Sequence, residues 1–203
     1  LSEKKLVLKE LGDKLSLSRN EAAKELEKEI VRHLAELNMA NTVFKVDIKK
    51  EEKFLKDGSD KVEFLICANI GLELGKLSKI ASGGELSRVM LAINCALLDT
   101  NEVPTMIYDE IDTGVSGRAA QKIAEKLYFV STGRQVLCVT HLAQIASMAD
   151  SHLLIEKKVD NSKTLTSVRK LMSDERINEL ARIIGGVEIT NNTLLSAQDM
   201  LIM

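Results

Sequence analysis

The sequence predicts an α/β fold in which helices flank a parallel sheet, with a long helix in front of it. Two short apolar runs, residues 103–108 and 135–139, are rich in strand-forming side chains. Between them, residues 118–130 carry apolar side chains at helical spacing. The order strand, helix, strand is typical of parallel sheets, which bind ligands at the carboxyl ends of their strands.

The N-terminal segment, residues 2–38, predicts a coiled-coil helix because no proline interrupts it and its apolar residues alternate at spacings of three and four. The predicted seam consists of Ala23, Leu26, Ile30, His33 and Leu37, continued upstream by Leu8, Leu11 and Leu15. Gly12 weakens the pattern, and His33 is interpreted as a tolerated polar insertion. We expect a coiled-coil stub at 1–38, a globular domain at 39–203, and the second strand of the coil outside this chain.

Composition limits the classes of function. The 203 residues are 45% apolar, which is enough for one well-packed core. With 28 basic and 30 acidic side chains the net charge is −2, so the chain as a whole does not attract nucleic acid, and any DNA contact needs a local patch or other parts of the protein. No signal peptide or membrane-length apolar run is apparent. The first residue is Leu, and we expect a piece of a longer or processed protein.

The three cysteines lie singly inside apolar runs, at spacings that suit neither a metal site nor a disulfide framework. They are expected to be buried thiols of a protein in the reducing cytosol.

The remaining periodic segments predict two further strand pairs and two further helices. They are residues 42–48 with 62–67 around a loop at 56–60, residues 151–156 with 164–171, a helix capped by Ser173 and closed by Gly185 and Gly186, and a last helix over 190–203. The mixed-charge stretch 49–53 is expected to be a solvated edge, and His152 to be structural.

A glycine-led helix is the first candidate site. Ser82, Gly83, Gly84 and Glu85 precede an apolar-periodic segment at 89–98. The unpaired N–H groups and the dipole of a helix N-terminus attract anions such as phosphate, and glycine lets a ligand approach the main chain. Ser82 could donate to that ligand or simply cap the helix, since Glu85 three residues later also fits an ordinary capping box.

The second candidate site lies where the two predicted parallel strands end. Asp109 and Glu110 directly follow the first strand, and Thr140 and His141 follow the second. Burying unpaired carboxylates is unfavourable, whereas nucleotide hydrolysis uses one carboxylate beside Mg²⁺ and another as general base. We expect Asp109, Glu110 and His141 to converge at one edge of the sheet.

Residues 71–78 superficially resemble a P-loop. Only three residues separate Gly71 from Gly75, where a P-loop has four, and Leu77 follows Lys76 where Ser or Thr is required. We interpret the stretch as a connecting loop, and a self-contained NTPase that uses it remains the less favoured alternative.

Three of these motifs together resemble the RecN family of SMC-like, ABC-type ATPases in bacterial DNA repair. They lie at residues 81–88, 109–118 and 140–146, and the resemblance covers most of the chain, from about residue 18 to its end. The first resembles the signature motif, residues 106–110 the Walker B strand with its catalytic glutamate, and Thr140 with His141 the switch histidine. SMC heads usually carry Asp where this chain has Ser116.

The resemblance implies the C-terminal lobe of an ATPase head with a stub of coiled coil. Asp109 would hold Mg²⁺ directly or through water, Glu110 would polarise the attacking water, and His141 would contact the γ-phosphate of ATP. The signature residues Ser82, Gly83, Gly84 and Glu85 would cap ATP bound to a second head. Arg88 would either position that closure or be a surface charge.

The resemblance also implies partners and a setting. These are the N-terminal lobe of the same protein, a second head that dimerises on ATP, DNA contacted by the full-length protein, and recombination proteins in double-strand break repair in the bacterial cytoplasm at the nucleoid, with no membrane role. Without a P-loop lysine, the chain alone is expected to bind ATP weakly and to hydrolyse it negligibly. The alternative is a non-enzymatic coiled-coil interaction or DNA-scaffold module.

Overall fold

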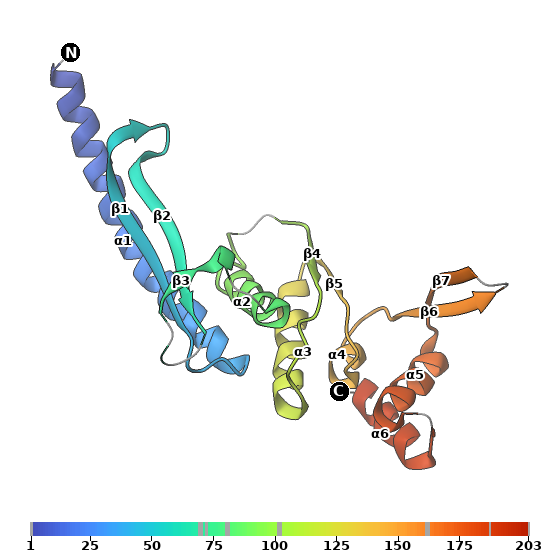
Figure 1. Cartoon of the computed structure of the whole chain (residues 1–203). Helices are drawn as coiled ribbons and strands as arrows, with labels where there is room; N and C mark the ends of the chain where they lie inside the picture. Colours follow the sequence, from blue (N-terminus) through green and yellow to red (C-terminus); the bar gives the residue numbers. More distant parts are fainter. Residues whose placement is uncertain are drawn as a thin grey trace. The chain divides into compact units, whose positions relative to one another are not determined.

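The structure, a computed structural model, describes residues 2–68, 71, 73–79, 82–100, 103–160, 163–186 and 188–202. The chain divides into two compact units, Leu1–Glu102 and Val103–Met203 (Figure 1). The predicted α/β class, with a parallel strand pair and flanking helices, is confirmed. In the described part of the chain, no helix combines the length and the apolar character needed to cross a membrane.

The first unit begins with α1, Ser2–Glu36, which runs without a break through Gly12. A Cβ atom at that glycine would lie 2.8 Å from Cε1 of Phe54. The missing side chain therefore makes room for an aromatic ring from the neighbouring strand, which explains the glycine that weakened the sequence pattern.

The seam of α1 finds its partners within the chain over its second half. Ala23, Ile30, His33 and Leu37 are buried, and α1 contacts β1, β2 and α2. The expectation that this whole seam needs a strand outside the chain is therefore wrong for its second half. The upstream leucines agree with that expectation, because Leu8, Leu11 and Leu15 remain 47%, 57% and 40% exposed.

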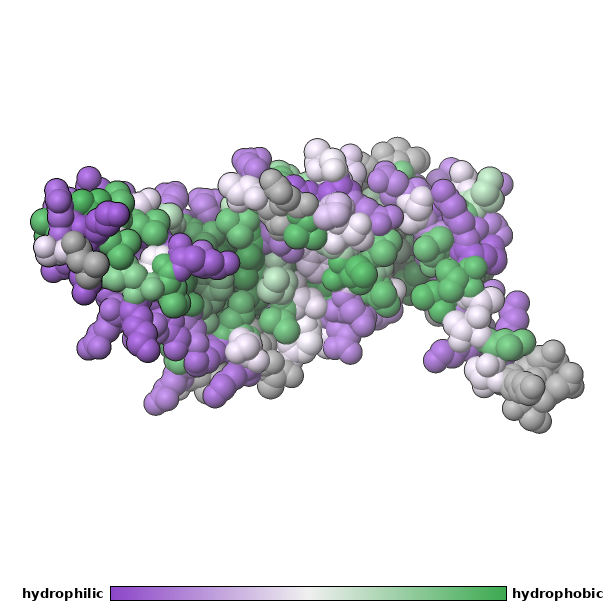
Figure 2. All heavy atoms as spheres, turned by 90° about the horizontal axis from the view of Figure 1, so that it is seen from above, coloured by the Kyte–Doolittle hydropathy of each residue, from purple (hydrophilic) through white to green (hydrophobic). Residues whose placement is uncertain are grey.

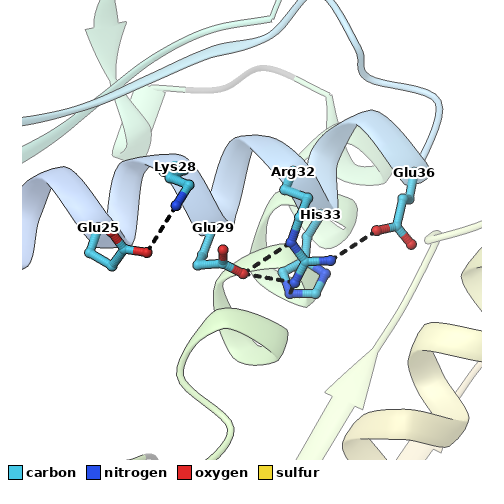
Figure 3. A network of polar contacts seen from close by, with 6 residues as sticks. All are labelled: Glu25, Lys28, Glu29, Arg32, His33 and Glu36. Atoms are coloured by element: carbon cyan, nitrogen blue, oxygen red, sulfur yellow. Dashed lines mark hydrogen bonds and ion pairs between the residues drawn. The ribbon is translucent and has the colours of Figure 1, made fainter.

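The outer face of α1 carries a chain of ion pairs (Figure 3). Arg32 lies between two carboxylates, 2.7 Å from Glu29 and 3.2 Å from Glu36, one helical turn to either side. Its guanidinium also lies 3.1 Å from Nε2 of the buried His33. Because arginine only donates hydrogen bonds, Nε2 of His33 must be the acceptor in this contact. His33 thus has a structural partner, as expected for a polar insertion.

A three-stranded antiparallel sheet packs beside α1. Strands β1 (Val43–Leu55) and β2 (Gly58–Cys67) form a hairpin, and the short β3 (Gly75–Lys76) pairs with β2. The predicted pair is confirmed, but β1 continues through the mixed-charge stretch 49–53, which is exposed along the strand. The loop expected at 56–60 shrinks to a turn because Leu55 already pairs with Gly58.

The core of the first unit lies between α1, the sheet and α2, Gly83–Ala96, which follows the 3-10 turn η1, Leu77–Lys79. Its largest fully buried side chains are Ile30, Leu34, Leu37, Phe44, Val89 and Leu91. The apolar period of α2 predicted from the sequence is therefore the face that packs into this core.

In the second unit, β4 (Thr105–Tyr108) and β5 (Gln135–Cys138) run parallel, joined by α3 (Gly117–Ser131). The apolar stripe of α3, predicted at 118–130, is buried and packs on β5 and on the short α4, Ala143–Ser147. This strand–helix–strand unit is the arrangement predicted from the sequence.

The second unit continues with an antiparallel hairpin and two helices. The hairpin consists of β6 (Leu153–Asp160) and β7 (Lys163–Lys170), and the helices are α5 (Ser173–Gly185) and α6 (Asn191–Ile202). Helices α4, α5 and α6 share a cluster of buried residues: Ala143, Ala146, Leu180, Ala181 and Ala197.

The predicted start of α5 needs a correction. Its N-cap is Met172, not Ser173, and the Glu175 carboxylate accepts a hydrogen bond from the Met172 backbone N–H at 2.9 Å. Glutamate three residues into a helix satisfies an otherwise unpaired N–H in this way. The predicted end is confirmed, since Gly186 adopts φ 74°, a left-handed conformation that glycine readily accepts.

Candidate functional site

The acid pair lies at the carboxyl end of β4, and both residues are exposed. Oδ1 of Asp109 accepts a hydrogen bond from the Glu110 N–H at 2.9 Å. Glu110 has φ 57°, and left-handed backbone is rare for any residue other than glycine. Strained residues of this kind cluster at functional sites, where the surrounding structure maintains the conformation. The turn after β4 therefore presents the Glu110 carboxylate to solvent at a conformational cost.

His141 lies beyond the end of the adjacent strand. Tyr108 pairs with Cys138 in parallel register, and the Val139 N–H donates to the Tyr108 carbonyl at 2.9 Å. The carboxyl ends of β4 and β5 therefore share one edge of the sheet. His141 follows two residues later, with a side chain 72% exposed. The acid pair and the imidazole thus leave the sheet from the same edge.

One side chain to which the sequence analysis gave no role connects the two strand ends. Asp112 is 3% exposed, and its Oδ2 accepts hydrogen bonds from Thr140 Oγ1 at 2.6 Å and from the His141 N–H at 2.9 Å. The same oxygen lies 3.1 Å from Nδ1 of His141. A carboxylate two residues beyond an acid pair was visible in the sequence, but its contact with the next strand end was not.

The donor set suits a magnesium–nucleotide complex better than a free cation. Among the described residues, no group of three or more His, Cys, Asp or Glu side chains could hold a metal ion. Magnesium bound with nucleotide usually takes only one or two carboxylates and completes its shell with phosphates and water. The exposed Asp109 fits that requirement, and its neighbour Glu110 stays available for a proton.

The glycine-led helix belongs to the first unit. Ser82 is the N-cap of α2, with extended φ −97° and ψ 121°, and its Oγ lies 3.5 Å from the Glu85 N–H. That distance exceeds the 2.7–3.2 Å of ordinary N–H···O bonds. The cap is therefore weak. Ser82 and Gly83 are exposed and Glu85 is half-buried, whereas Gly84 is buried. Ala81, the first residue of the motif, lies outside the described residues.

Arg88 is not a surface charge. Its side chain lies on the core side of α2 at 7% exposure, and burial lowers the pKa of its guanidinium, opposed in part by the charge of Glu85. Of its two proposed roles, the surface one is therefore wrong.

The P-loop-like stretch does not form a phosphate loop. Gly75 and Lys76 form β3 and pair with Ile66 and Leu65 of β2, and the Lys76 amine binds the Glu63 carboxylate. A P-loop would instead wrap a phosphate and lead directly into a helix. Leu72 lies outside the described residues, but the pairing of Lys76 supports the interpretation as a connecting segment.

The turn after the acid pair ends at Ser116, the N-cap of α3. Its backbone is extended, with φ −158°, and its side chain makes no capping hydrogen bond. Ser116 is exposed.

The cysteines are free thiols. Cys67 and Cys95 are buried, as predicted, whereas Cys138 is only half-buried. Burial, with smaller contributions from Asp112 and Asp109, raises the pKa of the Cys138 thiol to about 12. A thiol with so high a pKa is a poor nucleophile at neutral pH.

Comparison with known proteins links these observations to DNA repair proteins. The chain is 46% identical to DNA repair protein RecN of Bacillus subtilis (strain 168) over 194 residues, covering 88% of this chain and 34% of that protein. It is 41% identical to DNA repair protein RecN of Vibrio cholerae over 192 residues, covering 94% of this chain and 35% of that protein. The chain spans about one third of the length of these relatives. No protein-family model matches it.

Solved structures agree on the fold. The Smc head domain with a coiled coil and joint from Pyrococcus yayanosii superposes with a TM-score of 0.58 at 18% identity, over 88% of this chain and 33% of that one. The Smc head domain with an extended coiled coil from Pyrococcus furiosus gives 0.51 at 18% identity, over 79% of this chain and 38% of that one. The chain thus has the fold of part of an SMC head. It is homologous to about one third of the length of DNA repair protein RecN, as its motifs predicted.

Proposed function

We propose that this chain is the C-terminal lobe of a RecN-like, ABC-type ATPase head that acts in DNA double-strand break repair. The observation that carries the proposal is the shared sheet edge from which Asp109, Glu110 and His141 emerge. Ligands of parallel sheets bind at this edge. Glu110 polarises the attacking water, His141 contacts the γ-phosphate, and Asp109 holds Mg²⁺ directly or through water. The metal, when bound with ATP, neutralises charge that develops on the phosphates.

The sheet itself argues for a missing neighbour. In the described part of the second unit, the parallel sheet has only the strands β4 and β5. Parallel sheets are normally larger and covered on both faces. Here Ile107, Leu137 and Val139 are 70%, 41% and 53% exposed. Apolar residues, in green, also lie between polar ones on the face of the chain seen in Figure 2. The N-terminal lobe of the same protein, which would bring the P-loop, is the natural cover.

The signature residues act across a dimer in this proposal. The weak cap of Ser82 and the exposure of Ser82 and Gly83 support a role for the motif Ser82, Gly83, Gly84 and Glu85 in capping ATP bound to a second head. A helix N-terminus with accessible N–H groups suits a phosphate. The dimer thereby encloses two ATP molecules. DNA and recombination proteins are contacted by the full-length protein at the bacterial nucleoid.

Reconstitution tests the enzymatic role. The 203-residue chain alone should show negligible ATP hydrolysis, and adding the N-terminal lobe should start it. Glu110→Gln should then lower turnover by about 10²–10⁴-fold, the usual contribution of a general base, while nucleotide still binds. Isothermal titration of MgATP with and without the lobe measures the binding. Unchanged ATP turnover in the Glu110→Gln protein would show that Glu110 does not polarise the attacking water.

The dimer role needs a separate experiment in the full-length protein. Ser82→Arg adds bulk and charge at the end of α2 and should abolish ATP-dependent dimerisation measured by light scattering. Thr190→Arg is the matched control, because Thr190 is likewise an exposed hydroxyl residue directly before a helix, α6. Equal dimerisation of the two variants would contradict the proposed role of Ser82.

A second candidate, a non-enzymatic coiled-coil module, is favoured by one observation. In the first half of α1, Leu8, Leu11 and Leu15 lie on one face at spacings of three and four and are 47%, 57% and 40% exposed. Such a row suits a second helix of a coiled coil. A module that works only through this coil would be indifferent to Glu110→Gln and to Ser82→Arg, so the two experiments above separate the candidates.

A further inference from the structure

Asp112 is a buried carboxylate that accepts two hydrogen bonds at one oxygen, Oδ2, and lies close to an imidazole ring. Its side chain is 3% exposed, and a buried carboxylate is unfavourable unless hydrogen bonds replace its hydration. All three groups around Oδ2 come from residues 140–141, beyond the adjacent strand: the Thr140 hydroxyl, the His141 N–H and the His141 ring. The carboxylate therefore spans two loops that the sequence separates.

The contact with the ring determines where the imidazole carries its proton. Nδ1 of His141 lies 3.1 Å from Oδ2. An ionised carboxylate repels a bare nitrogen lone pair and attracts an N–H group, so this contact favours the proton on Nδ1. In the neutral ring the other nitrogen, Nε2, then has a free lone pair. The ring is held by its Nδ1 edge while its side chain is 72% exposed, which leaves Nε2 as the nitrogen available to a ligand.

The backbone around the histidine is held by the same carboxylate. The Thr140 hydroxyl donates to Asp112 at 2.6 Å and accepts from the Leu142 N–H at 3.1 Å, directly before α4. With the His141 N–H at 2.9 Å, the carboxylate orders three consecutive residues. Two residues before Asp112 lies Glu110, so one side chain connects the loop of the proposed base to the loop of the histidine.

We propose that Asp112 is a positioning residue for His141: it fixes the Nδ1–H tautomer and holds the ring at the edge of the sheet where Glu110 lies. The effect of Asp112 on turnover rests on the proposed ATPase function, whereas the tautomer of His141 does not depend on that function. Carboxylates that orient a metal-bound histidine are commonly worth about 10–100-fold in activity, and we expect an effect of that size here. The role is distinct from those of Asp109 and Glu110, which act on the metal and on water.

The tautomer is measured on the 203-residue chain labelled with ¹⁵N-histidine. Long-range ¹H–¹⁵N correlation should show His141, assigned by the loss of its signals in His141→Gln, protonated at Nδ1 and bare at Nε2. Asp112→Ala should return His141 to the Nε2–H form that free histidine prefers. The exposed Asp150→Ala is the control and should change nothing. An Nε2–H tautomer in the unmodified chain, or an unchanged Nδ1–H form in Asp112→Ala, would overturn the inference.

Turnover of the complete protein tests the positioning. Asp112→Ala should lower kcat by about 10–100-fold with little change in KM. The double variant Asp112→Ala with His141→Gln should be no slower than His141→Gln alone, because one residue acts through the other. Multiplying effects would refute the positioning role. If Asp112→Ala does not fold, Asp112→Asn enters the same cycle, and the tautomer of the unmodified chain still decides. If the complete unmodified protein does not hydrolyse ATP but His141 is protonated at Nδ1, the ATPase function is wrong and the inference about the tautomer is still supported.

Discussion

Arg19 on α1 and Asp60 on β2 form an ion pair of 2.9 Å in which the Asp60 side chain is only 1% exposed. Ser16, one turn earlier on the helix, donates a second hydrogen bond to Asp60 at 2.7 Å. The guanidinium also donates to the carbonyl of Asp57 at 2.6 Å, in the turn of the hairpin. These bonds attach the tip of the β1–β2 hairpin to the long helix.

Asp60→Ala should lower the free energy of unfolding by about 2 kcal/mol, because hydrogen bonds to a charged group are worth roughly 1.5–3 kcal/mol. Urea unfolding followed by circular dichroism measures the change. Asp13→Ala is the matched control, since Asp13 also pairs with a basic residue, Lys50, but is 49% exposed. An exposed pair contributes at most about 1 kcal/mol, so equal losses in the two variants would contradict this account.

The same carboxylate should make stability depend on pH. The hydrogen bonds from Ser16 and Arg19 lower the pKa of Asp60 below its usual value. Its contribution is therefore fully present above the unfolded pKa of about 4, declines below it, and is lost as the pH falls through the folded pKa. The difference in unfolding free energy between the unmodified chain and Asp60→Asn should stay constant from pH 7 to about pH 4 and shrink below. A constant difference down to pH 2 would contradict the lowered pKa.

The ring of Phe54, and not the geometry of α1, should be what disfavours a side chain at position 12. Alanine normally stabilises a helix interior by about 1 kcal/mol relative to glycine. At Gly12 the added Cβ would lie 2.8 Å from the Phe54 ring, so Gly12→Ala should gain clearly less than that or destabilise the chain. In the Phe54→Ala background the full gain should return. The same small effect of Gly12→Ala in both backgrounds, measured by urea unfolding, would rule out the steric explanation.

The left-handed backbone at Glu110 should lower the free energy of unfolding of the chain. Left-handed backbone costs a residue with a Cβ about 1–2 kcal/mol. The free energy of unfolding of Glu110→Gly should therefore be about 1 kcal/mol higher than that of Glu110→Ala. Both lack the carboxylate, so the comparison isolates the backbone. At Lys122, an exposed position inside α3, the order should reverse, with alanine the more stable. Alanine more stable than glycine at both positions would mean that Glu110 carries no backbone strain.

The sequence by itself determined the elements and their polar ends. The apolar periods of β4, α3 and β5, and the acid pair and histidine that follow the strands, are local patterns, because each depends only on the spacing of neighbouring residues. Parallel pairing then follows from the order of the elements, which brings the two strand ends to one edge. The start of α5 differs from the prediction by one residue, because the Glu175 carboxylate accepts a hydrogen bond from the Met172 N–H and no side chain of Ser173 is needed as a cap.

Only the tertiary structure decided which side chains meet across the chain. Asp112 with His141, Arg19 with Asp60, and Gly12 with Phe54 join residues far apart in the sequence. The burial of Arg88 and of the second half of the α1 seam likewise appears only once the helices pack. A carboxylate or a glycine has the same local preference wherever it stands, and its partner is set by packing and burial, which local preferences do not encode.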